Sequence, residues 1–243
     1  MSKRIVAVVC GVVLMLAAAV DASAQMQWND VVFINVSGGV QTGTKTFDTT
    51  FASSVYEEPF TVETTQELKG GGLFDITGGG KIRGNFGAAL SFTARSSKSD
   101  ATAVASVPDP IFFDQFRTVT STIADLEHSE KWVGILGVWF VPVGEKLDLM
   151  LMGGPAVASV THETPTTATV TETGGAPTVT LGIESISKSF WGYHIGADLR
   201  YMITRNLGVG GFARFNGASG NLTDDNELSV GGFQIGGGLR IRF

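Results

Sequence analysis

The final segment of the chain, Leu228 to Phe243, alternates strictly between two kinds of side chain. One set is apolar or small and ends on the aromatic carboxyl-terminal residue: Ser229, Gly231, Phe233, Ile235, Gly237, Leu239, Ile241 and Phe243. The other set is polar or glycine: Gly232, Gln234, Gly236, Gly238, Arg240 and Arg242. Because successive side chains of a strand point to opposite faces, this period of two predicts a β-strand with one apolar and one polar face.

The amino terminus predicts an export signal. Lys3 and Arg4 form a short basic region, an apolar stretch follows over 5–20, and Ala22-Ser23-Ala24 has the small residues of a signal-peptidase site. We therefore expect residues 1–24 to be a cleaved signal peptide. Residues 25–243 are then expected to form a single β-barrel domain.

The cysteine count and the charge restrict the chemistry of the mature chain. Cys10 is the single cysteine and lies inside the predicted signal, so disulfides and thiolate metal sites are excluded from the mature part. A lipoprotein interpretation of Cys10 is disfavoured because Val8 and Val9 are too large for a lipobox. The formal charge of −6 makes nucleic acid an unexpected partner for a secreted chain.

The alternation of the final segment recurs along the mature chain. Together with the final segment, the repeats predict eight strands, at about 32–41, 68–83, 85–93, 131–141, 147–157, 191–201, 207–216 and 230–243. Each is at least as long as the roughly 9 to 11 residues with which a tilted strand crosses a bilayer. No mature segment has the roughly 20 consecutive apolar residues of a membrane helix.

The predicted connections alternate between short and long. Short turns are expected near 83–85, 142–146 and 204–206, and long loops at about 42–60, 97–130, 162–180 and 217–227. This pattern predicts an all-β fold, a membrane-spanning up-and-down antiparallel β-barrel of eight strands with four long extracellular loops and short periplasmic turns. A barrel of ten strands is the alternative, because 97–130 is long enough for another pair of strands. A soluble β-sandwich would instead turn its apolar faces inward.

The polar faces of the predicted strands carry a set of charged and amide side chains: Asp148, His194, Asp198, Arg200, Arg214, Gln234, Arg240 and Arg242. In a barrel these side chains converge on one lumen, where arginines and carboxylates form charge-assisted hydrogen bonds. In a soluble sheet they would be solvated.

Aromatic residues on the apolar faces fall into two groups. We expect Trp132, Trp191 and Tyr193 to face outward near the long loops. A second outward group is expected near the short turns: Phe86, Phe140, Tyr201 and Phe243. Two such groups are typical of the aromatic girdles at membrane interfaces.

Two stretches of the sequence, 192–210 and Val230 to Phe243, resemble the eight-stranded outer-membrane barrels of Gram-negative bacteria, such as the OmpA transmembrane domain, OmpX and OmpW. The resemblance implies location in the cell outer membrane, contact with its lipids and lipopolysaccharide, and insertion by the barrel assembly machinery with Phe243 as an assembly signal. It does not imply one activity, because one fold hosts many functions.

The interior of an eight-stranded barrel is just wide enough for side chains to fill it. We therefore expect a non-enzymatic protein with a structural or surface-interaction role that acts through its loops. Inward glycines leave room for an alternative, a narrow porin-like or hydrophobic-solute channel. The sequence does not indicate a surface ligand or an oligomeric state.

One predicted loop carries an apolar run that is a candidate contact cluster: Ile111, Phe112, Phe113 and Phe116. Exposed apolar clusters mark interaction sites. The alternative is that the cluster packs over the barrel mouth or enters the outer leaflet.

A lipid-modifying enzyme would need a histidine close to the hydroxyl group that it activates. His128 and Ser129 are adjacent, so in a regular strand they point to opposite faces. The sequence therefore predicts no catalytic, cofactor-binding or metal-ligating residues.

Overall fold

The computed structural model describes residues 31–112, 114–173, 176–223 and 226–243, so the predicted signal peptide lies outside the described residues. The described part forms ten strands: β1 (Val32–Thr42), β2 (Lys45–Val55), β3 (Glu58–Leu68), β4 (Gly71–Arg83), β5 (Phe86–Pro108), β6 (Phe116–Pro142), β7 (Leu147–Thr173), β8 (Ala176–Met202), β9 (Leu207–Thr223) and β10 (Asn226–Arg242). No helix in these residues has the length and hydrophobicity of a transmembrane segment.

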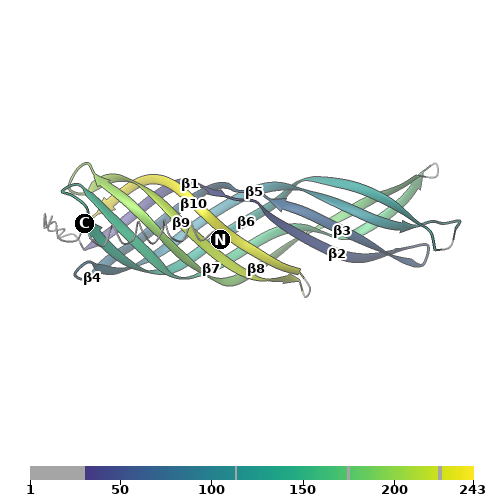
Figure 1. Ribbon diagram of the computed structural model, residues 1–243, viewed down its shortest axis with the longest axis horizontal. Coiled ribbons are helices and arrows are strands. Elements are labelled where there is room, and N and C mark those ends of the chain that lie inside the picture. The colour runs from purple at the N-terminus through teal and green to yellow at the C-terminus, as the bar shows by residue number, and fades with distance from the viewer. Residues whose placement is uncertain (1–30, 113, 174–175, 224–225) are drawn as a thin grey trace, which may run out of the picture.

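Eight of these strands close into a ring (Figure 1). The antiparallel order is β1, β4, β5, β6, β7, β8, β9 and β10, and β10 pairs back with β1 from Phe33–Arg242 to Thr42–Phe233. The three short turns lie where the sequence predicts them, between β4 and β5, β6 and β7, and β8 and β9. The predicted fold class, an eight-stranded up-and-down barrel, is confirmed.

The wall of the barrel is apolar outside and polar inside. On β10, the outward Ile235 and Leu239 are 48% and 50% exposed, whereas the inward Arg240 is 1% exposed. A soluble sandwich would have the opposite arrangement, because water favours burial of the apolar face. The structure therefore shows that the polar face of the strands points into the barrel and the apolar face points outward.

The exposed apolar residues form a continuous belt around the ring. On β8 the belt runs from Trp191 to Tyr201, and the next outward residues beyond Trp191 are Ser189 and Ser187. This length matches the roughly 9 to 11 residues that a tilted strand needs to cross a bilayer.

Aromatic residues gather at both edges of the belt, but two of the predicted girdle residues were assigned wrongly. Trp132 and Phe140 on β6 are 2% exposed and point inward. Strand β6 is apolar on both faces in this region, so alternation could not distinguish its sides. The other predicted girdle residues are exposed: Phe86, Trp191, Tyr193, Tyr201 and Phe243.

At the end opposite the short turns, the barrel continues into a projection that we call the stalk (Figure 1). Strands β5 to β8 run far past the belt, and the hairpin of β2 and β3 joins them by pairing β3 with β5 from Thr61–Ser106 to Gln66–Ala101. Three of the four segments predicted as long loops are therefore largely paired strand within the stalk. The fourth, at 217–227, is the shorter hairpin of β9 and β10.

The stalk has an apolar core of its own, with the buried members Phe60, Val62, Ala103, Ala105, Val107, Ala168 and Val179. Ser53 Oγ donates to Ala168 O at 2.9 Å and joins β2 to β7. Near the tip, Arg117 forms ion pairs with Asp109 and Glu172, which connect the β5–β6 and β7–β8 hairpins. A core and cross-links of this kind give the stalk a defined shape.

Candidate functional site: the lumen and its outer mouth

At the short-turn end, the lumen is filled by charged and aromatic side chains. Asp148 on β7 accepts a hydrogen bond from Arg200 Nε at 2.5 Å and lies 3.4 Å from Arg242 Nη1. The Arg200 guanidinium also lies 5.0 Å from the ring centre of Phe140 and 5.7 Å from that of Phe33. Cation–π contacts of this kind compensate a guanidinium for lost water.

The next layer is a bidentate ion pair. Arg240 Nε and Nη2 donate to the two carboxylate oxygens of Asp198 at 2.9 and 2.6 Å, and Nη1 donates to Ser37 Oγ at 2.8 Å. This layer links β10, β8 and β1 across the lumen. Two parallel hydrogen bonds fix both the distance and the orientation of the guanidinium.

Above it, Arg214 anchors a third layer. Its Nη1 donates to Asp75 Oδ2 at 2.6 Å and its Nε to Gln234 Oε1 at 2.6 Å. Thr93 donates to the same Asp75 oxygen at 2.8 Å, and Gln234 Nε2 donates to Gln41 Oε1 at 2.7 Å. Residues of five strands therefore meet in one hydrogen-bonded plug.

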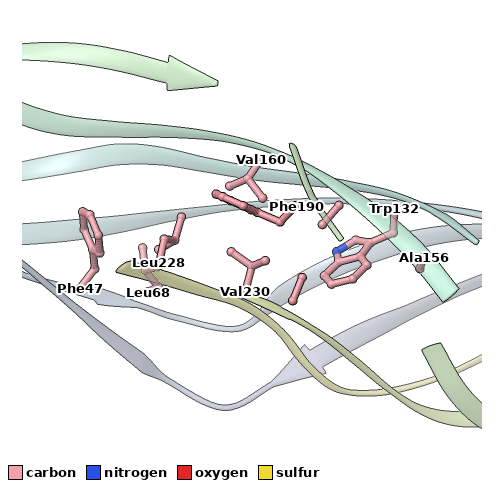
Figure 2. Close-up of a cluster of buried hydrophobic side chains, with 10 residues drawn as sticks. Phe47, Leu68, Trp132, Ala156, Val160, Phe190, Leu228 and Val230 are labelled. Carbon is pink, nitrogen blue, oxygen red and sulfur yellow. The ribbon is translucent and has the colours of Figure 1, made fainter. Parts of the chain in front are cut away.

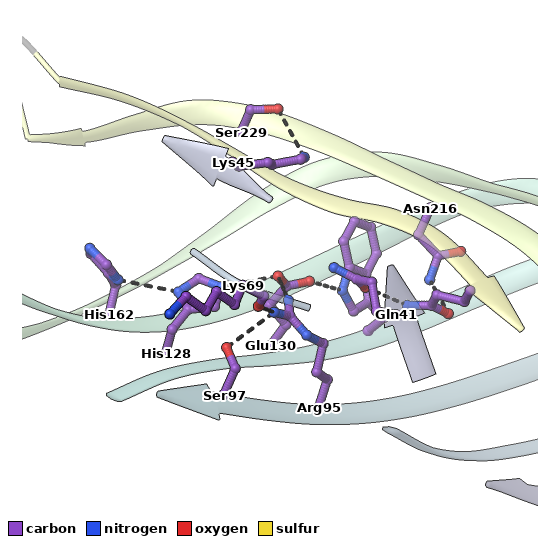
Figure 3. A network of polar contacts seen from close by, with 12 residues as sticks. Gln41, Lys45, Lys69, Arg95, Ser97, His128, Glu130, His162, Asn216 and Ser229 are labelled. Carbon is purple, nitrogen blue, oxygen red and sulfur yellow. Dashed lines mark hydrogen bonds and ion pairs between the residues drawn. The ribbon is translucent and has the colours of Figure 1, made fainter. Parts of the chain in front are cut away.

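A fourth layer lies beyond the outer edge of the belt, around Glu130 (Figure 3). Arg95 Nη1 donates to Glu130 Oε1 at 2.5 Å, His128 Nε2 lies 3.0 Å from the same oxygen, and Trp132 Nε1 donates to Oε2 at 2.9 Å. Burial raises the pKa of Glu130, but the His128 and Arg95 contacts outweigh it and leave the pKa below its ordinary value. Glu130 is therefore held as a carboxylate.

His162 faces His128, with the two Nδ1 atoms 3.2 Å apart and the edge of the Phe47 ring against His162. Burial, and next the charge of His128, lower the pKa of His162 to about 3. No group of three metal-ligating side chains occurs among the described residues.

An apolar cluster closes the lumen beside this fourth layer (Figure 2). Its buried members come from strands of both the barrel and the stalk: Phe47, Leu68, Trp132, Ala156, Ala158, Val160, Phe190, Ala218, Leu228 and Val230. The lumen is thus occupied by four charged layers and an apolar cap.

The structure brings most of the predicted lumen residues into these layers. His194 is buried near Arg214 but makes no hydrogen bond through Nε2 with the described residues. The prediction omitted three carboxylate or guanidinium partners: Asp75, Arg95 and Glu130. Asp75 carried a usable signal, because it alternates with Phe74 and Ile76, whereas Arg95 and Glu130 lie at the edges of segments predicted as loop.

The histidine considered for catalysis points away from its neighbouring hydroxyl. His128 is 1% exposed and contacts Glu130 and His162, while Ser129 lies on the opposite face of β6. The arrangement ties β6 to β7 and does not place a base beside a nucleophile.

The candidate contact cluster lies at the tip of the stalk. Ile111, Phe112 and Phe116 are 79%, 58% and 56% exposed, and Phe113 lies outside the described residues. Asp109 Oδ1 accepts hydrogen bonds from the backbone N–H groups of Ile111 and Phe112 at 2.9 and 3.2 Å, which holds the turn. From Arg95 to Pro108, β5 rises about 3.3 Å per residue, roughly 40 Å in all. The cluster is therefore distant from both the barrel mouth and the belt.

A pocket of about 220 Å³ opens in the wall beside the fourth layer, between the start of β2 and β10. Lys45, Arg95, His128 and Glu130 contribute its polar lining, and Phe215 and Phe233 its apolar lining. Lys45 Nζ donates to Ser229 Oγ at 3.2 Å. Burial lowers the pKa of Lys45, and the nearby Glu130 opposes this shift.

Comparison with known proteins gives structural neighbours only, since no family model and no curated protein sequence matches the chain. The outer membrane protein OprG from Pseudomonas aeruginosa aligns over 88% of this chain and 96% of its own, with 7% identity and a TM-score of 0.46. The N-terminal β-barrel domain of OprF from the same organism aligns over 88% and 98%, with 13% identity and a TM-score of 0.37. The Yersinia pestis outer membrane protein Ail aligns over 88% and 100%, with 16% identity and a TM-score of 0.38. These neighbours are small outer-membrane barrels, the kind of protein that the last strands resemble.

Proposed function

We propose that this protein is an integral outer-membrane β-barrel with a closed lumen, which acts without catalysis by presenting its stalk to a partner at the cell surface. The observation that carries the proposal is the sidedness of the wall, with an apolar belt outside and ion pairs inside. In water the belt would expose far more contiguous apolar surface than a soluble protein tolerates. In a bilayer the same belt is buried in hydrocarbon.

The layers of the lumen favour a closed barrel over a porin-like or hydrophobic-solute channel. Three arginines reach carboxylates on strands that are not their neighbours: Arg214 on β9 pairs with Asp75 on β4, Arg240 on β10 with Asp198 on β8, and Arg242 on β10 with Asp148 on β7. Arg95 pairs with Glu130 of the neighbouring strand β6, and both side chains are buried. A solute would have to separate buried ion pairs, and removing one partner of such a pair costs about 3 to 5 kcal/mol.

The stalk is the region that we expect to bind a partner. It extends past the belt on paired strands, has its own core, and exposes Ile111, Phe112 and Phe116 at its tip. Binding residues on a rigid scaffold lose little conformational entropy when they meet a partner. The predicted signal peptide agrees with export to the outer membrane and assembly there.

Planar-bilayer recording tests the closed lumen. The refolded mature protein is expected to give no steady conductance. The double variant Asp198→Ala with Arg240→Ala is also expected to stay closed, because three other charged layers and the apolar cap still fill the lumen. Heat-modifiable gel mobility verifies that both proteins are folded barrels. Steady conductance of the folded wild-type protein would make the channel alternative correct.

A further inference from the structure

The wall of the barrel is interrupted where the stalk begins. β1 pairs with β10 only as far as Thr42–Phe233, after which the chain turns at Gly43, where φ is +103°, and enters β2. β2 pairs with β3 and not with β10. Between Asn226 and Gly232, β10 therefore forms backbone pairing with β9 only. At Gly231 its φ is +82°. The pocket beside Lys45 occupies this gap.

A groove of about 370 Å³ adjoins the pocket on the outer surface and shares Lys45, Phe215 and Ser229 with it. Trp191 and Tyr193 form the far wall of the groove and are 78% and 53% exposed. The combined site has a cation at one end and an aromatic surface at the other.

The ammonium group of Lys45 can bind an anion, because the carboxylate in the pocket lining is engaged by other side chains. Glu130, the nearest carboxylate in the lining, is already engaged by Arg95, His128 and Trp132. Lys45 donates to a neutral hydroxyl, that of Ser229. Arg95 also lines the pocket, and its Nε is buried without a hydrogen-bond partner among the described residues. The site therefore carries unbalanced positive charge at its inner end.

The position of the site relative to the edge of the apolar belt indicates which part of the membrane it contacts. Phe215 and Phe233 are the last apolar residues of the belt on β9 and β10, and the next outward side chains are Ser219 and Ser229. Aromatic belts mark the level of lipid headgroups. Lys45 thus lies at headgroup height, with the aromatic surface on the acyl-chain side.

We propose that this site binds an outer-leaflet lipid that carries an anionic phosphate, with the phosphate on Lys45 and an acyl chain along Trp191, Tyr193 and Phe215. A phosphate group matches the ammonium and the Ser229 hydroxyl, and the aromatic groove matches the acyl chain. Free phosphate would not use the groove, and a neutral lipid would leave Lys45 without a counter-charge. This inference rests on the outer-membrane barrel proposed above.

Native mass spectrometry in a neutral detergent tests the site. We expect the wild-type protein to retain phosphatidylglycerol in preference to uncharged diacylglycerol. Lys45→Gln is expected to weaken phosphatidylglycerol binding about tenfold, as the loss of one charge-assisted hydrogen bond gives, and Lys45→Arg to restore it. The matched control Lys188→Gln removes an exposed lysine of β8 that lines neither the pocket nor the groove, and it is expected to bind as the wild type does.

Three results would overturn the inference: equal binding by Lys45→Gln and wild type, equal retention of diacylglycerol, or displacement by inorganic phosphate at comparable concentration, which would indicate a free-anion site. Heat-modifiable mobility and vesicle insertion are measured on the same samples. Failure of insertion would refute the outer-membrane barrel itself, whereas insertion without Lys45-dependent retention would refute only the lipid site.

Discussion

At the scale of the residue, the fourth layer depends on a histidine that must stay neutral. His162 is 0% exposed, and its Nδ1 faces His128 Nδ1 at 3.2 Å, so one ring has to donate and the other accept. Burial disfavours a charge on the His162 ring, and the nearby charge of His128 adds to this effect. The pKa of His162 is therefore lowered to about 3.

This neutrality predicts a pH dependence of stability. Between pH 6.5 and 4.5 the unfolded chain protonates His162 while the folded protein does not, so the free energy of unfolding falls as pH falls, by up to about 1.4 kcal/mol per pH unit. His162→Phe should reduce this slope. Urea unfolding in vesicles at several pH values measures it, with Glu163→Gln as the control. Below about pH 4.5 the free energy of unfolding falls further, because the pKa of Glu130 is lower in the folded protein than in the unfolded chain. An unchanged slope in His162→Phe would contradict the prediction.

At the scale of the element, β10 has two parts with different roles. From Phe233 to Arg242 it closes the ring against β1, and from Asn226 to Val230 it continues as a hairpin with β9 alone. Gly231 lies at the junction. A Cβ atom there would lie 2.4 Å from Asn216 O, and its φ of +82° is one that L residues rarely adopt. Glycine therefore permits the strand to leave the wall.

Substitution at this junction should weaken the folded barrel. Gly231→Ala combines a steric clash with an unfavourable φ, and we expect a loss of about 1 to 3 kcal/mol in the free energy of unfolding. Gly211→Ala on β9 is the matched control, because its Cβ would meet Gly236 O at an ordinary 3.5 Å. Urea unfolding of both variants gives the comparison. Equal stability of the two would show that β10 does not need glycine at the junction.

At the scale of the whole molecule, the barrel and the stalk are joined by shared strands but closed by different contacts. The ring closes through β1 and β10 without β2 or β3. The stalk core, in contrast, takes Phe60 and Val62 from β3. Removing the β2–β3 hairpin should therefore affect the two parts unequally.

We expect the deletion of residues 46–67, with a two-residue glycine–serine linker, to leave a folded barrel. Lys45 and Leu68 are partners across the hairpin, so a short linker spans them. Heat-modifiable mobility should be retained, while limited proteolysis should cut the distal parts of β5 to β8, because their apolar core is exposed. Loss of the heat-modifiable form would show that the barrel requires the stalk.

Much of the architecture could be predicted from local alternation. The number of ring strands, the three short turns and the two faces of β10 all follow from patterns within about ten residues, because strand side chains alternate regardless of what they later meet. The polar residues Arg240 and Gln234 were placed on one face for the same reason. Alternation did not predict the inward side of β6, because both faces of this strand are apolar near Trp132 and Phe140.

Tertiary structure decided which face points inward and which charges meet. Arg214 pairs with Asp75 across 139 positions of the sequence, a partnership that no local pattern encodes. The stalk also needed long-range pairing, since the threonine-rich segments that resemble loops become strands only when β3 pairs with β5 and β7 with β8. The physical reason is that alternation is a property of one strand, whereas closure, pairing and charge contacts depend on strands that are distant in the chain.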